Sequence, residues 1–180
     1  MALQLDWIQK PWNTKVFWSS GSSLVCLNAN YVWSRSQWFR LISGPLEHAG
    51  NVHFMISLLF IIPKIYRLED KTSMFKLVGL IFSSIIGTSV VYIILQYVLN
   101  HWTDIYVFEC VQGLSGPSFA MKVLTYFIGK FGVTSFLFEV IELLVLLEER
   151  TFLYHLSGLI AGLVIWYWVK PEQFPGQGMV

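Results

Sequence analysis

The chain has 180 residues, of which 55% are hydrophobic and 13% are charged, and its mean hydropathy is +0.58. This composition excludes an ordinary soluble domain and predicts an all-α membrane protein, because helices satisfy their own backbone hydrogen bonds inside a bilayer. The net charge of +1 also excludes a general electrostatic attraction to nucleic acid. We therefore expect a lipid bilayer, and no nucleic acid, among the partners of the chain.

The N-terminal segment, residues 1–37, gives the weakest membrane signal. Residues 1–15 mix polar and aromatic side chains and predict no signal peptide, so that targeting would fall to the first spanning helix. Residues 16–34 are uncharged, but their Ser, Gly and Asn content makes them a doubtful sixth span. We interpret this stretch as a lumenal or interfacial segment, which leaves the first span uncertain or missing.

Five clear transmembrane helices are predicted within a membrane domain that covers residues 38–169. Two of them carry no Asp, Glu, Lys or Arg, whereas three carry ionisable side chains that should face the interior of a helical bundle or a water-filled cavity. Residues 170–180 then form a short cytosolic tail. The predicted spans are residues 50–66, 77–103, 115–129, 132–147 and 151–169.

The distribution of basic residues predicts the orientation of this bundle. Lys64, Arg67, Lys71 and Lys76 cluster in the link between the first two clear spans, whereas the links on the opposite side are more acidic. The positive-inside rule places this link and the C-terminal tail in the cytosol. The polar residues discussed below would then lie near the lumenal or extracellular side.

The two cysteines, Cys26 and Cys110, have neither CxxC nor zinc-ligand spacing. We expect two unpaired thiols in apolar surroundings, with pairing in an oxidising lumen as the alternative. A metal site built on two histidines would need a third ligand, and the best carboxylates are predicted deeper in another span. The sequence therefore predicts no metal and no cofactor.

A serine between glycines, in the run Gly113-Leu114-Ser115-Gly116, is the first candidate for chemistry. Serine is a poor nucleophile until a base removes its proton, and histidine is the usual base. His155 is the histidine inside a late predicted span. At a helix N-terminus, Ser115 would also lie beside backbone N–H groups that favour a developing oxyanion.

His155 begins a stripe that continues with Gly158 and Gly162 on one helical face. The two glycines form a GxxxG pair, which lets another helix approach closely. If that helix is the one that opens at Ser115, His155 comes within reach of Ser115. Phe119, one turn further on, could then stack on the imidazole and orient it.

An earlier polar set consists of His48, His53 and Ser57. His53 and Ser57 are four residues apart and therefore share one helical face. Because His53 would enter the membrane from the same side as Ser115, it suits an oxyanion donor better than a base. We interpret His48 as a loop histidine outside the site.

Each of these motifs also has a purely structural interpretation. Ser115 could cap a helix, and GxxxG alone serves packing more often than catalysis. Lys122 lies about 10 Å further along the helix than Ser115, at 1.5 Å per residue. We therefore interpret Lys122 as a partner for Glu139 or Glu142 and not as a base for Ser115.

Taken in order, the motifs resemble the rhomboid intramembrane serine proteases over roughly residues 38–169. The matches are a Trp-x-Arg loop followed by His-x4-His, the Gly-x-Ser-Gly run, and the His-x2-Gly-x3-Gly stripe. The resemblance implies a rhomboid-like helical bundle, transmembrane proteins as substrates, and neither cofactor nor metal. It is greatest to the animal endoplasmic-reticulum members, so we expect that membrane as the location.

The resemblance also implies a role for each matching residue. Ser115 would be the nucleophile, and His155 the general base and acid. His53 and the Ser115 backbone N–H would stabilise the oxyanion, with Ser57 at the position of the family's asparagine. The other matches are Gly113, Gly116, Phe119, Gly158 and Gly162 in packing around the site, and Trp38 and Arg40 in a first loop against the lipid interface.

Two departures from the family pattern keep rival hypotheses open. Ser57 is shorter than asparagine, and loss of one oxyanion donor lowers a rate by about a hundred- to a thousandfold. The doubtful first span is the second departure. The leading hypothesis is an intramembrane serine endopeptidase, and the alternative is a rhomboid-like pseudoprotease that binds client helices. A third hypothesis, a small channel or transporter, is motivated only by Lys122, Glu139 and Glu142 at membrane depth.

Overall fold

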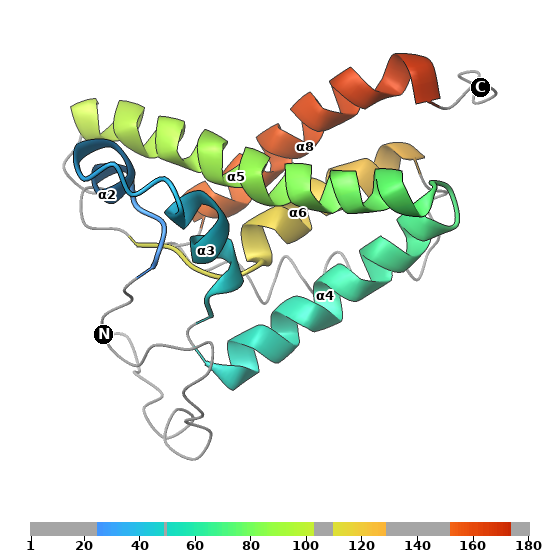
Figure 1. Cartoon of the computed structure of the whole chain (residues 1–180), viewed down its shortest axis with the longest axis horizontal. Helices are drawn as coiled ribbons and strands as arrows, with labels where there is room; N and C mark the ends of the chain where they lie inside the picture. Colours follow the sequence, from blue (N-terminus) through green and yellow to red (C-terminus); the bar gives the residue numbers. More distant parts are fainter. Residues whose placement is uncertain (1–24, 49, 103–109, 129–151, 174–180) are drawn as a thin grey trace.

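The computed structural model describes residues 25–48, 50–102, 110–128 and 152–173 (Figure 1). These ranges contain helices and one isolated antiparallel bridge, between Leu27 and Val111. The described part therefore has the all-α architecture that composition predicts. The helices are α2 (Ala29–Ser34), α3 (Arg40–Leu46), α4 (Asn51–Glu69), α5 (Met74–Trp102), α6 (Ser115–Ile128) and α8 (Phe152–Gln173).

Three helices are long and apolar enough to cross a membrane: α4, α5 and the Phe152–Val169 part of α8. They coincide with the predicted spans 50–66, 77–103 and 151–169. The predicted span 115–129 corresponds to α6, whose 14 residues extend about 21 Å, less than the roughly 30 Å of a bilayer core. The predicted span 132–147 lies outside the described residues, so the structure supports three of the five predicted spans.

Helix α6 contacts α4, α5 and α8, and most of its residues are buried. In Figure 1 it lies behind α5 and beside α8. Glycines allow the α8 contact: a Cβ at Gly158 would collide with the carbonyl of Gly116, and one at Gly162 would lie 2.7 Å from the Ala120 carbonyl oxygen. Because these are contacts with backbone, no side-chain adjustment could relieve them. The backbones of α6 and α8 therefore lie directly against each other.

The N-terminal segment is described from Val25 onward and does not form a spanning helix there. Leu27 pairs with Val111 in the bridge, and Asn28 caps the short helix α2 by accepting the Asn30 N–H at 2.8 Å. Gln96 of α5 accepts the Ala29 N–H at 2.6 Å, which fixes α2 against α5. The described half of residues 16–34 is thus a folded connection and not a membrane span, and residues 16–24 lie outside the described ranges.

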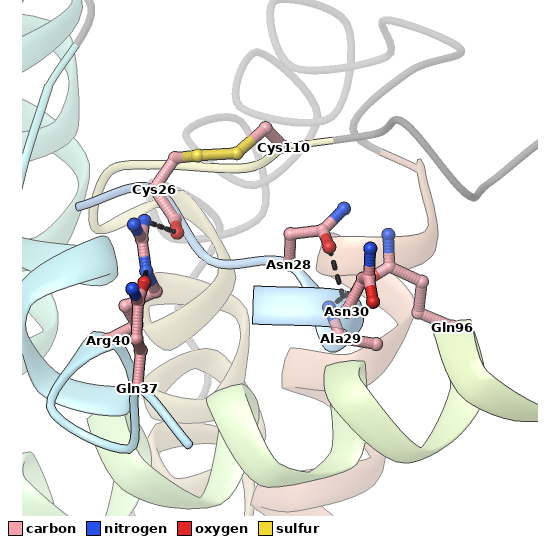
Figure 2. Close-up of a disulfide and its surroundings, with 8 residues drawn as sticks. All are labelled: Cys26, Asn28, Ala29, Asn30, Gln37, Arg40, Gln96 and Cys110. Carbon is pink, nitrogen blue, oxygen red and sulfur yellow. Dashed lines mark hydrogen bonds between the residues drawn. A yellow bond between two sulfur atoms is a disulfide. The ribbon is translucent and has the colours of Figure 1, made fainter. Parts of the chain in front are cut away.

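Cys26 and Cys110 form a disulfide, with 5.6 Å between their Cα atoms (Figure 2). The expectation of two unpaired thiols was wrong. The antiparallel bridge between Leu27 and Val111 holds the two segments side by side, and the cysteine next to each bridge residue comes within reach of the other. The cysteines are 84 residues apart in sequence, so only the folded chain reveals their proximity.

The predicted first-loop residues have different environments. Arg40, the first residue of α3, is buried, and its guanidinium donates to the Cys26 carbonyl at 2.7 Å and to Gln37 at 2.6 Å (Figure 2). It also lies 4.5 Å from the centre of the Tyr31 ring, a cation–π distance. Trp38, by contrast, is half exposed. Arg40 therefore ties the segment that carries the disulfide to α3.

Lys64 requires a correction to the loop assigned from sequence. It lies inside α4, is 4% exposed, and donates to the Ser118 hydroxyl of α6 at 2.8 Å. The residues between α4 and α5 are only 70–73. The basic cluster that supports a cytosolic link therefore consists of Arg67, Lys71 and Lys76, and Lys64 instead joins two helices in the interior.

Candidate active site

The segment before Ser115 is extended and is held on several sides. Val111 exchanges two backbone hydrogen bonds with Leu27, and the Gly113 N–H donates to the Gly44 carbonyl at 3.2 Å. Gly113 has φ of +99°, a conformation that favours glycine. Ser115 follows as the first residue of α6 and is 4% exposed. We call residues 110–114 the nucleophile loop, after the role that the sequence predicts for the adjoining Ser115.

The α6–α8 contact brings Ser115 close to the helical turn of His155. Gly116, next to Ser115, lies between residues on both sides of that histidine: a Cβ on Gly116 would be 2.7 Å from the Tyr154 ring, and Gly158 faces the Gly116 carbonyl. His155 is 7% exposed, and among the described residues its Nε2 has no hydrogen-bond partner. Ser115 and His155 therefore lie on helical turns that face each other directly. The described residues place no hydrogen bond on His155 Nε2.

Phe119 stacks on the His155 ring, with centroids 4.7 Å apart and an angle of 24° between the planes. Both residues are buried. Phe119 lies one turn after Ser115 on α6, so the same helix supplies the serine and the aromatic face that supports the imidazole. The amine of Lys122 lies 5.2 Å from the centre of the same phenyl ring. Glu139 and Glu142, the partners expected for Lys122, lie outside the described residues.

His53, in the first turn of α4, lies against the nucleophile loop. A Cβ on Gly113 would be 2.6 Å from His53 Cε1 and 3.1 Å from its Nε2, so the imidazole fits only because residue 113 has no side chain. Ser57, one turn further along α4, is 3% exposed, and its hydroxyl has no hydrogen-bond partner in the described ranges. Ser115, His155 and His53 are thus gathered around one loop, whereas Ser57 makes no bond to it.

His48 lies in the loop between α3 and α4, as expected, but its exclusion from the site overlooked a contact. It is 1% exposed; its Nε2 accepts the Leu114 N–H at 3.3 Å, and its Nδ1 lies 3.1 Å from the Leu46 carbonyl oxygen. Only the tautomer with hydrogen on Nδ1 satisfies both contacts. Burial, with a smaller effect from His53, lowers the pKa of His48 to about 4, which keeps the ring neutral. Its spacing of five residues from His53 was the available sequence signal.

Tyr154 is a second residue that sequence reasoning missed. Its hydroxyl donates to the Gly113 carbonyl at 3.0 Å, and its side chain is 1% exposed. Its ring meets the Tyr92 ring edge to face at 5.5 Å. In the sequence Tyr154 was one apolar residue of a long span, and no pattern pointed from it to the nucleophile loop. In the described ranges, no three His, Cys, Asp or Glu side chains gather as metal ligands.

A family model for the rhomboid domain matches residues 35–172 of the chain. The chain belongs to the rhomboid family. The match covers α3 to α6 and nearly all of α8, and it includes every candidate site residue on these helices and in the loops between them. Cys26 and Leu27, which join the nucleophile loop through the disulfide and the backbone bridge, lie before the matched region.

Curated relatives support the same assignment. Human rhomboid-related protein 4 is 26% identical over 152 residues, which cover 77% of this chain and 48% of that protein. The orangutan (Pongo abelii) protein of the same name is 31% identical over 101 residues, or 55% of this chain and 32% of that protein, and the mouse protein is 28% identical over 102 residues. This chain thus spans about half or less of the length of these rhomboid relatives. No solved structure matches it.

Proposed function

We propose that this rhomboid-family chain is a serine endopeptidase that cleaves transmembrane or juxtamembrane segments of other membrane proteins. The observation that carries the proposal is the opposition of Ser115, at the N-terminus of α6, to the α8 turn of His155. Phe119 supports the imidazole from one face, and His155 Nε2 makes no hydrogen bond within the described ranges. A nucleophile beside an oriented base with an unused nitrogen is the arrangement that nucleophilic catalysis needs.

The proposed reaction begins when Ser115 Oγ attacks the carbonyl carbon of the scissile peptide bond and His155 Nε2 takes the hydroxyl proton. The C–N bond then breaks, and the same proton passes from His155 to the leaving amine. A water molecule, deprotonated by His155, attacks the resulting ester; when the C–O bond breaks, the proton returns to Ser115 Oγ. The products are a carboxylate and an amine, and the enzyme is restored without a cofactor.

The oxyanion of each tetrahedral intermediate would be stabilised at the N-terminus of α6. The N–H groups of a first helical turn have no acceptor within the helix and lie at the positive end of the helix dipole. The Ser115 N–H belongs to this turn, and His53 approaches the same loop from α4. If Ser57 does not reach the oxyanion, hydrolysis should be slower by about a hundred- to a thousandfold than with a full set of donors.

The disulfide supports a lumenal or extracellular location for this end of the bundle. Disulfides persist in oxidising compartments and are rare in the cytosol. Cys110 begins the nucleophile loop, so the loop and Ser115 would face the same compartment as the disulfide. This orientation agrees with the one inferred from Arg67, Lys71 and Lys76. We propose the endoplasmic-reticulum membrane, because the motifs are most similar to those of animal rhomboids of that organelle.

The second candidate function is that of a pseudoprotease that binds client transmembrane helices without cleaving them. Ser57 is the observation in its favour, since its buried hydroxyl makes no hydrogen bond in the described part of the chain. In that case the rhomboid fold would be retained while the oxyanion donors were too few for hydrolysis.

A labelling experiment separates the two functions. The purified, folded protein is incubated with a fluorophosphonate probe, beside Ser115→Ala and His155→Ala. If the protein is a protease, the probe should label it and should label neither Ser115→Ala nor His155→Ala. Cleavage of a helical transmembrane substrate should follow the same pattern, and equal cleavage by the protein and Ser115→Ala would rule out the catalytic role of Ser115. Failure of the intact protein to label would favour the pseudoprotease.

A further inference from the structure

Two hydrogen bonds from opposite sides of the site end on one peptide group, the one that joins Gly113 to Leu114. Tyr154 of α8 donates its hydroxyl to the carbonyl of this group at 3.0 Å. His48, before α4, accepts the N–H of the same group at 3.3 Å. Because the peptide is trans, its C=O and N–H point in opposite directions, so the two side chains hold it from both ends.

The remaining backbone groups of these two residues are also used. The Gly113 N–H donates to the Gly44 carbonyl, and the Leu114 carbonyl accepts the Ser118 N–H at 2.8 Å as α6 begins. The next N–H along the chain is that of Ser115, the backbone donor proposed for the oxyanion. The direction of this N–H depends on how the preceding peptide group is held.

We propose that Tyr154 is a positioning residue for Ser115, and that it acts with His48 to hold the Gly113–Leu114 peptide group in the orientation that catalysis requires. This inference rests on the proposed protease function, which it deepens. Neither side chain is assigned a role at the reacting atoms: Tyr154 acts through the Gly113 carbonyl, and His48 through the Leu114 N–H.

The nucleophile loop needs such an anchor because of Gly113. Glycine has access to a wide range of φ, and here it adopts +99°, so the peptide group after it could rotate at little local cost. Rotation would break both hydrogen bonds and leave the Tyr154 hydroxyl and the Gly113 carbonyl buried without each other. Buried polar groups that lose their partners are costly, so the two bonds select one orientation.

The position of Tyr154 also couples the loop to the base. Tyr154 precedes His155 on α8, and its ring contacts Gly116 directly after Ser115. A single turn of α8 therefore holds the base and the anchor of the nucleophile. A shift of α8 along α6 would therefore displace His155 from Ser115 and strain the Tyr154–Gly113 hydrogen bond at the same time, so this bond also opposes loss of the geometry between Ser115 and His155.

The first test compares Tyr154→Phe, which removes only the hydroxyl, with Tyr92→Phe, which removes the hydroxyl of the neighbouring buried tyrosine. On a transmembrane substrate, Tyr154→Phe should lower kcat about tenfold with KM within twofold, whereas Tyr92→Phe should retain the kcat of the unmodified protein. His48→Gln keeps a hydrogen-bond acceptor and should retain more activity than His48→Phe. The phenylalanine keeps an aromatic ring but cannot accept the Leu114 N–H. A merely structural role predicts no such kcat-specific loss and no rescue by glutamine.

The second test does not depend on activity. Amide hydrogen exchange is measured for peptides that contain residues 110–118, with peptides from the middle of α5 as the internal control. Tyr154→Phe should speed exchange in residues 110–118 at least tenfold and leave α5 unchanged. If the unmodified protein cleaves substrate but Tyr154→Phe leaves either kcat or the exchange rate unchanged, the positioning role is wrong. The proposed protease function is then unaffected. If the unmodified protein neither cleaves substrate nor labels with the serine probe, the protease proposal fails, and the positioning role in catalysis fails with it.

Discussion

Phe119 lies nearly parallel to the imidazole of His155, with ring centroids 4.7 Å apart and planes inclined by 24°. Both side chains are buried between α6 and α8, where the glycines of α8 allow the helices to touch. Packing can thus fix the plane of the ring, which in a Ser-His-Asp triad is the task of a carboxylate. The stacking therefore supports the proposed Ser115–His155 dyad, in which a single aromatic side chain would orient the base.

Replacement of Phe119 by leucine should therefore impair catalysis more than folding. An aromatic pair of this geometry is worth about 0.5–1.5 kcal/mol, so kcat should fall about two- to thirteenfold as the imidazole samples other orientations. The matched control is Phe127→Leu, the same change at the far end of α6. The ring centroids of Phe127 and Trp166 are 5.0 Å apart. Turnover of a transmembrane substrate, measured well below the thermal midpoint of each variant, checks the prediction. Equal losses in the two variants would contradict an orienting role for Phe119.

The glycines of α8 should be intolerant of any side chain. Gly158→Ala places a methyl group against the Gly116 carbonyl, and Gly162→Ala places one against the Ala120 carbonyl. A backbone carbonyl cannot move aside as a flexible side chain can, so α6 and α8 must separate. Each variant should lose about 1–3 kcal/mol of stability. Thermal unfolding in detergent is the measurement. Gly79→Ala in α5 is the control, since an added Cβ there meets nothing within 4 Å, and its midpoint should not fall.

The parts of the molecule that sequence predicted well are those in which local pattern determines structure. Long uncharged runs predicted α5 and α8, because length and hydropathy are sufficient to define a spanning helix. The Gly158–Gly162 spacing predicted a close helix contact because glycine at four-residue intervals exposes backbone on one face. The stacking of Phe119 on the imidazole of His155 was also expected, because the same register between the two helices brings the two rings together.

The features that sequence reasoning missed depend on contacts between distant segments. The Cys26–Cys110 disulfide follows from a backbone bridge between segments 84 residues apart. Lys64 was assigned to the link together with the basic residues that follow it, yet α4 continues past it as far as Glu69. His48 and Tyr154 looked like an ordinary loop histidine and an ordinary apolar ring. The positioning role proposed for them rests on their hydrogen bonds to the Gly113–Leu114 peptide group, which only the folded chain reveals.

The disulfide should stabilise the described fold and report its orientation. It closes a loop of 84 residues, for which loop entropy predicts about 4–5 kcal/mol at most and typical measured values are about 2–4 kcal/mol. The double variant Cys26→Ser, Cys110→Ser should unfold at a lower temperature than the unmodified protein. Reductant should lower the thermal midpoint of the unmodified protein and leave that of the double variant unchanged. In sealed vesicles with the cytosolic face outward, a membrane-impermeant reductant should leave the disulfide intact until detergent is added. Reduction without detergent would contradict a lumenal active site.

Acidification should weaken the anchor at His48. The ordinary pKa of histidine is 6.5, and burial followed by the nearby charge of His53 lowers the pKa of His48 to about 4. Between these values the unfolded chain binds a proton that the folded chain does not, so stability should be greatest above about pH 6.5 and fall as pH decreases towards 4. Protonation would also place hydrogen on Nε2, which could then no longer accept the Leu114 N–H. Thermal midpoints measured from pH 7.5 to 4, beside His48→Gln, check this. The variant has no titrating ring at this position and should lose less stability over that interval, whereas parallel curves would show that His48 does not contribute.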